Sequence, residues 1–148
     1  MRALIIHANK FATRVVRESN KPFGIQSEVV NSPEHNMNNC IVAFFTVEKP
    51  DSENELENLY NEIVKASTET GTKNLMIVPF VHLSNNIADP KKAKEFYENI
   101  MNKFRNADYI IGSSPFGYHK SLLLDAKGHP TSFRYREFNR GGKENEMV

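Results

Sequence analysis

The stretch that decides the fold is Cys40-Ile41-Val42-Ala43-Phe44-Phe45-Thr46-Val47. Its nearly continuous apolar character predicts a strand that is buried on both faces of a sheet. A helix follows at once, because Ser52 and Glu55 have the spacing of a capping box. Apolar residues then recur at helical spacing, and Gly71 is placed to end the helix in a left-handed conformation. A buried strand followed by an amphipathic helix of about four turns indicates an α/β fold.

The same alternation continues towards the C-terminus. Asp89 and Pro90 have the positions of an N-cap and a first helical residue, so a second amphipathic helix is predicted over residues 90–106. Further strands are predicted at residues 75–84, 108–113, 118–126 and 131–137. We therefore predict the α/β class, with a mixed β-sheet and two amphipathic helices packed on it.

The N-terminal third has weaker signals. Residues 3–6 predict a short buried strand, and we expect residues 11–18 to pair back on it as a second strand. Residues 19–39 are rich in Asn, Ser, Pro and Glu, which indicates an irregular connection with at most a short strand at residues 25–30.

Length and composition bound the function. The 148 residues suit one domain, expected over residues 1–137, with residues 138–148 as a polar tail or linker. A net charge of +1 excludes a strong basic field for long nucleic acid but allows a partner touched over a few nucleotides. The single cysteine, Cys40, excludes an intrachain disulfide. No apolar run suits a signal peptide or a membrane span, so we expect a cytoplasmic protein without membrane contact.

The candidate site begins with Ser113-Ser114-Pro115-Phe116-Gly117-Tyr118-His119-Lys120, a tight turn between two apolar runs. Proline fixes one φ angle there and glycine permits a positive one. The turn presents a phenol, an imidazole and an ammonium group, which together can stabilise an oxyanion, move a proton or hold a phosphate. The plainer interpretation is a strand-turn-strand whose polar residues only face water.

A second segment converges on this turn. Val81-His82-Leu83-Ser84 follows a predicted strand, and ligands bind at the carboxyl ends of strands in open α/β sheets. If the two preceding strands are neighbours, His82 and Lys120 are expected to face one crevice. The sequence has no phosphate loop, no zinc-type cluster of Cys and His, and no nucleophilic serine elbow, so no metal is expected at the site.

Five blocks of the sequence carry a resemblance to a known family. They are Met1-Arg2-x-Leu4-Ile5-Ile6-His7, Val42-Ala43-Phe44-x-x-Val47-Glu48-Lys49, Val78-Pro79-Phe80-Val81-His82-Leu83-Ser84, Ser114-Pro115-Phe116-Gly117-Tyr118-His119-Lys120 and Lys127-Gly128-His129-Pro130. In this order and spacing, the chain resembles the N-terminal editing domain of archaeal threonyl-tRNA synthetases. The resemblance implies a D-aminoacyl-tRNA deacylase-like fold, a homodimer, and hydrolysis of seryl-tRNA(Thr) without a cofactor.

The resemblance also implies roles for individual residues. Lys120 would be the principal catalytic side chain, and His82 would line the site. The family has Tyr where His119 stands, and His119 remains able to donate a hydrogen bond or carry a proton. The family has Glu where Phe133 stands. The implied substrate-binding residues are Val47, Phe80, Val81, Pro115, Phe116 and Gly117.

The implied partners are the 3′ acceptor end of tRNA(Thr) carrying serine and a synthetase catalytic domain, in the same chain or in trans. Two alternatives stay open. One is a module that binds the acceptor end or dimerises without turnover, which the missing carboxylate at Phe133 favours. The other is a deacylase for a D-aminoacyl-tRNA, which Lys120 and His82 would serve equally well.

Overall fold

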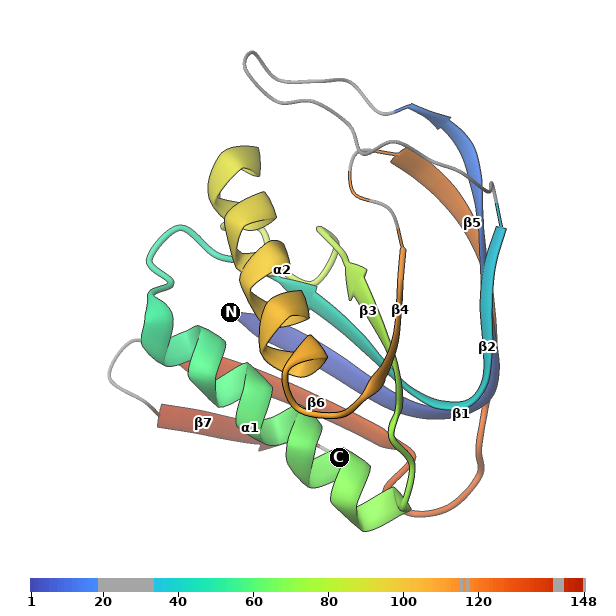
Figure 1. Cartoon of the computed structure of the whole chain (residues 1–148). Coiled ribbons are helices and arrows are strands. Elements are labelled where there is room, and N and C mark those ends of the chain that lie inside the picture. The colour runs from blue at the N-terminus through green and yellow to red at the C-terminus, as the bar shows by residue number, and fades with distance from the viewer. Residues whose placement is uncertain (19–33, 115, 117, 140–142, 148) are drawn as a thin grey trace.

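The computed structural model describes residues 1–18, 34–114, 116, 118–139 and 143–147. Its strands are β1 (Arg2–Glu18), β2 (Glu34–Thr46), β3 (Asn74–Pro79), β4 (Ile110–Ser113), β5 (Tyr118–Ala126), β6 (Phe133–Asn139) and β7 (Lys143–Met147). These described strands form one mixed sheet in the order β4-β3-β2-β1-β6-β7, and β5 pairs with the part of β1 beyond β6. The helices α1 (Glu53–Thr70) and α2 (Pro90–Arg105) lie together over one face of this sheet (Figure 1).

Both helices begin where the sequence predicts. The Ser52 N–H donates to the Glu55 carboxylate at 2.7 Å, which completes the capping box of α1. Gly71 ends α1 with a φ of 73°, and Asp89 caps α2 by accepting a backbone N–H. Neither of these two described helices is long and apolar enough to cross a membrane.

The strands β1 and β2 bend together at one point. Ala8 and Phe11 both pack in the apolar cluster that faces away from the helices, although an odd spacing along a regular strand would put them on opposite faces. Cys40 and Met37 of β2 show the same odd spacing. Asn39, between them, has a φ of 45°, which Asn adopts more readily than most residues. The two strands exchange faces together, and their pairing register is the same on both sides of the bend.

This bend corrects two predictions. Residues 11–18 do not pair back on residues 3–6, because the chain passes through the bend and continues as one strand paired with β2. Residues 34–39 are a strand and not an irregular connection, because they pair with the outer half of β1. The short strand predicted at residues 25–30 lies outside the described residues.

The C-terminal segment also differs from its prediction. Lys143–Met147 forms β7 antiparallel to β6, where a polar tail was expected. Edge pairing uses backbone groups alone, so it leaves no apolar pattern in the sequence to detect. The domain boundary at residue 137 stays a prediction.

Each face of the sheet has its own apolar core. One cluster fills the space between the sheet and the helices, and includes Phe45, Leu59 and Phe104. The second is enclosed where the outer halves of β1 and β2, with β5, rise to face β3 and β4 (Figure 1). Cys40 is fully buried in this second cluster, and burial raises the pKa of its thiol to about 11. Cys40 therefore has the environment of a small core residue, as expected, and not that of a nucleophile.

Gly112 of β4 leaves no room for a side chain at the second cluster. An added Cβ would meet Met76 Sδ and lie 3.2 Å from Met37 Cε. We expect Gly112→Ala to lower the free energy of unfolding by about 1–3 kcal/mol, because overpacking displaces its neighbours. Gly128 is the matched control, since a Cβ there meets nothing within 4 Å. Urea unfolding of both variants checks this, and equal losses would contradict it.

Candidate functional site

The carboxyl ends of β2, β3 and β4 meet at one edge of the sheet. The strands are parallel, with Phe45 opposite Pro79 and Ile77 opposite Ser113. The strand that precedes His82 and the strand that enters the turn before Lys120 are therefore neighbours, as the site prediction required. This edge is the part of an α/β sheet where ligands bind.

Hydrogen bonds to β2 hold the loop over residues 80–88. The Thr46 hydroxyl donates to the Phe80 carbonyl at 2.6 Å and accepts from the Leu83 N–H at 3.3 Å. At the far end of the loop, the Ala88 N–H donates to the Val47 carbonyl at 2.9 Å. The loop therefore leaves β3 and returns to the end of β2.

A row of aromatic rings leads from the second cluster to this loop. Phe11, Phe44, Phe80 and His82 are in successive edge-to-face contacts, with centroids 5.9, 5.2 and 4.9 Å apart. His82 is exposed at the end of the row, and Val81 is 55% exposed beside it. Packing on Phe80 thus places the imidazole of His82 at the surface, on the side of the second cluster.

Lys120 lies on the same side of the sheet. It stands in β5 opposite Val15, and Leu124, four residues further along, packs against the second cluster. Positions separated by an even number share one face of a strand, so the half-buried Lys120 lies on the inward face of β5. Phe80 packs against the same cluster. We still predict that His82 and Lys120 line one crevice. This prediction requires both residues to lie on the same side of the sheet.

The other predicted site residues that the structure describes face in different directions. His119 is exposed, and as the neighbour of Lys120 in β5 it takes the opposite face of that strand. Val47 and Phe116 pack in the cluster on the helix side, where the rings of Phe116 and Tyr97 of α2 lie 6.1 Å apart. Phe80, in contrast, packs against the second cluster. Pro115 and Gly117 lie outside the described residues.

Phe133 begins β6, paired with Ile6 of β1 and 48% exposed. Glu137 shares its face of the strand, as alternation requires. The carboxylate of Glu137 accepts from the Tyr135 hydroxyl at 3.0 Å and lies 3.9 Å from the Arg2 guanidinium. Glu137 is thus engaged with Arg2 at the other end of β6 and does not stand at Phe133.

A buried charge cluster next to the loop was not predicted. The Met1 ammonium donates to Glu48 at 2.8 Å, to Asp51 at 2.6 Å and to the Phe138 carbonyl at 3.0 Å. The other carboxylate oxygen of Glu48 accepts from the Ser84 hydroxyl at 2.6 Å. Burial opposes ionisation of Glu48, but hydrogen bonds from the ammonium and Ser84 outweigh it and hold the pKa below its ordinary value. No local pattern connects these residues, so spacing could not reveal the cluster.

A second polar cluster lies at the bend of the sheet. His7 Nδ1 is 2.7 Å from His129 Nε2, and His7 Nε2 is 3.1 Å from the Asn39 side-chain oxygen. Burial, with smaller contributions from His129 and Lys127, lowers the pKa of His7. The part of the chain described here has no group of three His, Cys, Asp or Glu side chains arranged to hold a metal ion. His7 therefore has a structural role, joining strands at the bend.

We expect stability to fall as the pH drops below about 6.5, the ordinary pKa of His. The unfolded chain then binds a proton at His7 more readily than the folded chain, and this difference favours unfolding. Urea midpoints measured between about pH 7.5 and 5.5 should show a smaller slope for His7→Asn than for the wild type. An unchanged slope in His7→Asn would refute this account.

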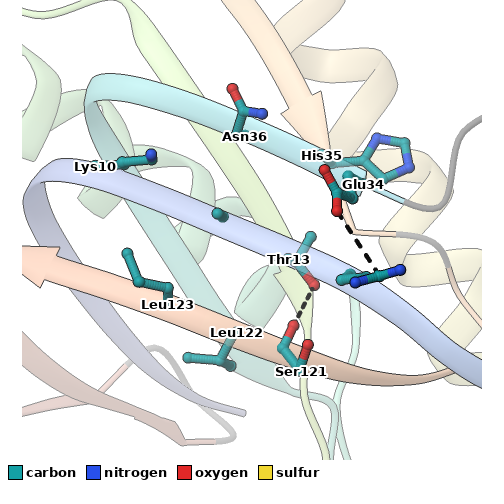
Figure 2. A pocket seen from close by; sticks show the side chains of 10 residues that line it. Lys10, Thr13, Glu34, His35, Asn36, Ser121, Leu122 and Leu123 are labelled. Atoms are coloured by element: carbon teal, nitrogen blue, oxygen red, sulfur yellow. Dashed lines mark hydrogen bonds and ion pairs between the residues drawn. The ribbon is translucent and has the colours of Figure 1, made fainter.

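A hollow of about 290 Å³ lies between the outer halves of β1, β2 and β5 (Figure 2). Two pairs of its polar groups bind one another: Arg14 lies 3.7 Å from Glu34, and the Thr13 hydroxyl donates to the Ser121 carbonyl at 3.2 Å. None of the predicted site residues that the structure describes lines it. The hollow is therefore separate from the candidate site.

Comparison with known sequences assigns the chain to a family. Residues 1–138 match the family described as the archaea-specific editing domain of threonyl-tRNA synthetase. A threonine–tRNA ligase of Methanococcus aeolicus is 30% identical over 147 residues, covering 97% of this chain and 22% of the relative. Another, of Pyrococcus furiosus, is 34% identical over 134 residues, covering 88% of this chain and 21% of the relative. The chain thus spans about a fifth of the length of these relatives.

A solved structure shares the fold. The c-Myc DNA Unwinding Element Binding Protein superimposes with a TM-score of 0.67 at 12% identity, over 100% of this chain and 98% of that one. At this identity the likeness concerns the fold alone. The predicted fold class, a mixed sheet with two helices in a D-aminoacyl-tRNA deacylase-like arrangement, is confirmed.

Proposed function

The chain belongs to the archaea-specific editing-domain family of threonyl-tRNA synthetases, and from this premise we propose that it hydrolyses mischarged seryl-tRNA(Thr). The bond cleaved is the ester between serine and the ribose of the terminal adenosine. In a chain of this family, the observation that carries the proposal is the placement of Lys120 on the same side of the sheet as the row of rings ending at His82.

The need for such a reaction follows from binding energies. Serine lacks only the methyl group of threonine, and one such group contributes roughly 1–3 kcal/mol to discrimination, or ~10–200-fold. A synthetase that requires greater accuracy uses a second site, too small for the correct amino acid, to hydrolyse the error. Such a site needs a rigid wall, and the hydrogen bonds that hold the loop over residues 80–88 support a role for this loop as that wall.

The proposed chemistry needs few protein groups. Water adds to the ester carbonyl, the carbonyl oxygen becomes an oxyanion, and the C–O bond to the ribose then breaks. The ribose oxygen takes up a proton, so the products are serine and uncharged tRNA. Lys120 would stabilise the oxyanion, because a preorganised cation on a half-buried surface acts with little screening by water. The proposal needs no metal or cofactor.

The substrate assignment can be tested by incubating the chain with L-seryl-, L-threonyl- and D-seryl-tRNA(Thr) and following ester loss. We expect fast hydrolysis of L-seryl-tRNA alone. Faster hydrolysis of D-seryl-tRNA would replace the proposal by a D-aminoacyl-tRNA deacylase. Binding of tRNA without any hydrolysis would replace it by a binding module, the alternative favoured by Phe133, which offers no carboxylate. The same assay over a range of concentrations of the chain, with and without a synthetase domain, would test whether two copies or that domain are needed.

Val81 is the residue of the loop on which the exclusion of threonine can be tested. Because Val81 is 55% exposed, its truncation to Ala should enlarge the pocket without unfolding the chain. We expect threonyl-tRNA hydrolysis by Val81→Ala to rise by roughly 10-fold or more, with seryl-tRNA hydrolysis much less changed. Ile87→Ala, 41% exposed on the same loop, is the matched control. Equal selectivity in all three proteins would remove Val81 from the pocket wall.

A further inference from the structure

We propose that Glu48 is a positioning residue that sets the loop over residues 80–88, and through it the discrimination between serine and threonine. The effect on discrimination rests on the proposed function, whereas the positioning of the loop rests on the hydrogen bonds of Glu48. One carboxylate oxygen accepts from the Met1 ammonium at 2.8 Å, and the other accepts from the Ser84 hydroxyl at 2.6 Å. Glu48 thus joins the start of β1 to the middle of the loop.

The loop side of this connection extends beyond Ser84. The Ser84 hydroxyl oxygen accepts from the Asn86 N–H at 3.0 Å, and the Lys49 N–H donates to the Asn86 carbonyl at 3.1 Å. Glu48 also forms an isolated antiparallel bridge with Ile87. The carboxylate of Glu48 therefore acts on the turn between Ser84 and Ile87, while the Thr46 hydroxyl holds the earlier part of the loop.

The other side of the connection is buried and fixed. The Met1 ammonium is fully buried, and it also donates to Asp51 at 2.6 Å and to the Phe138 carbonyl at 3.0 Å. The second oxygen of Asp51 accepts from the Glu48 N–H at 2.6 Å. The Arg2 guanidinium lies 3.6 Å from Glu48. The Met1 ammonium and Arg2 therefore fix the carboxylate of Glu48 for Ser84, whereas Asp51 binds only the backbone of Glu48.

The chemistry requires a carboxylate at this position. Both oxygens of an ionised Glu accept hydrogen bonds, whereas Gln has one acceptor and one NH₂ donor. In Glu48→Gln, an NH₂ group that faces the ammonium would lose that hydrogen bond, and one that faces Ser84 would reverse the direction of the hydrogen bond there, so the charged acceptor shared by the two groups is lost in either orientation. Ser84 is only two residues after His82, so this change would weaken one of the two attachments of the segment that carries Val81 and His82, the other being the Thr46 hydroxyl. Misplacement of a wall by about 1 Å is enough to change the rate by up to about 100-fold.

The experiment compares Glu48→Gln and Ser84→Ala with Asp51→Asn as the matched control. Asp51 binds the same ammonium and the Glu48 N–H, and its carboxylate makes no described contact with the loop. We expect Glu48→Gln and Ser84→Ala each to lower the ratio of seryl- to threonyl-tRNA hydrolysis by roughly 10-fold, and the double variant to lower it no further. Asp51→Asn should keep the wild-type ratio even if its melting temperature falls. Equal ratios in all variants, or an equal loss in Asp51→Asn, would overturn the role of Glu48.

Hydrogen exchange separates this inference from the proposed function. Exchange of the Leu83 and Asn86 amides is measured without substrate, so it does not depend on catalysis. These amides should exchange faster in Glu48→Gln than in the wild type or Asp51→Asn. If the wild type hydrolyses no aminoacyl-tRNA, the proposed function fails, and the exchange rates still decide whether Glu48 sets the loop. Identical exchange in the three proteins would refute the positioning role whatever the activity.

Discussion

Replacing Lys120 by Met should lower the rate of seryl-tRNA hydrolysis by ~100–1,000-fold while the fold stays intact. Met keeps much of the length of the side chain but removes the charge and three hydrogen-bond donors. The expected loss is that of one preorganised oxyanion donor, about 2.7–4 kcal/mol of transition-state stabilisation. The physical reason is the placement of Lys120, a half-buried residue on the face of β5 from which Leu124 packs against the second cluster.

The matched control for this variant is Lys65→Met. Lys65 is exposed on α1, and α1 lies over the opposite face of the sheet. Lys65→Met and Lys120→Met lower the net charge by the same amount. Lys65→Met therefore reports any general effect of charge on tRNA binding. Single-turnover rates and circular dichroism should show a large loss of rate only in Lys120→Met, with both folds unchanged. An active Lys120→Met protein would remove Lys120 from the mechanism.

The second large effect is on stability. Glu62→Ala should lower the free energy of unfolding by about 3–5 kcal/mol, because Glu62 is the carboxylate shared by two buried arginines. Its Oε1 lies 3.6 Å from Arg134 and 3.0 Å from Arg136, and all three residues are about 5% exposed. Arg134 also pairs with Glu69. These contacts join β6 to α1, so the substitution leaves excess positive charge inside the contact between helix and sheet.

Glu57→Ala is the control for the ion pair itself. Glu57 lies 2.9 Å from Lys103, and the Glu57 side chain is 52% exposed. An exposed pair contributes about 1 kcal/mol or less, because water already stabilises both charges. Urea unfolding at neutral pH should therefore separate the two variants clearly. Similar losses in Glu57→Ala and Glu62→Ala would show that burial of the arginines does not control the effect.

The parts of the fold that were predicted correctly have local signals. The capping box at Ser52, the N-cap at Asp89 and the apolar run of β2 each depend on neighbours within one or two turns of chain. The outer half of β2 and the strand β7 were missed because their residues are polar and their pairing uses the backbone. The continuity of β1 was missed because its apolar period changes phase at the bend.

The candidate site shows the same division. The rule on strand ends made the convergence of His82 and Lys120 conditional on neighbouring strands, and the strands before His82 and before the turn are neighbours. The rule could not predict that Val47 and Phe80 pack on opposite faces of the sheet. Side chains alternate between the two faces along a strand, so the face of a residue depends on the position at which the strand ends. The cluster of Met1 with Glu48 connects residues 47 positions apart, and an ion pair of this kind leaves no period in a sequence.

The shared bend of β1 and β2 limits how the sequence can change during evolution. Because both strands exchange faces at Asn9 and Asn39 while their register continues, the two positions act as one joint made of two separately encoded halves. A deletion of one residue on one side of the joint in β1 would turn the rest of that strand inside out relative to β2. Descendants of this chain should therefore keep both halves or change both in step, so that length and residue type at positions 9 and 39 vary together across lineages.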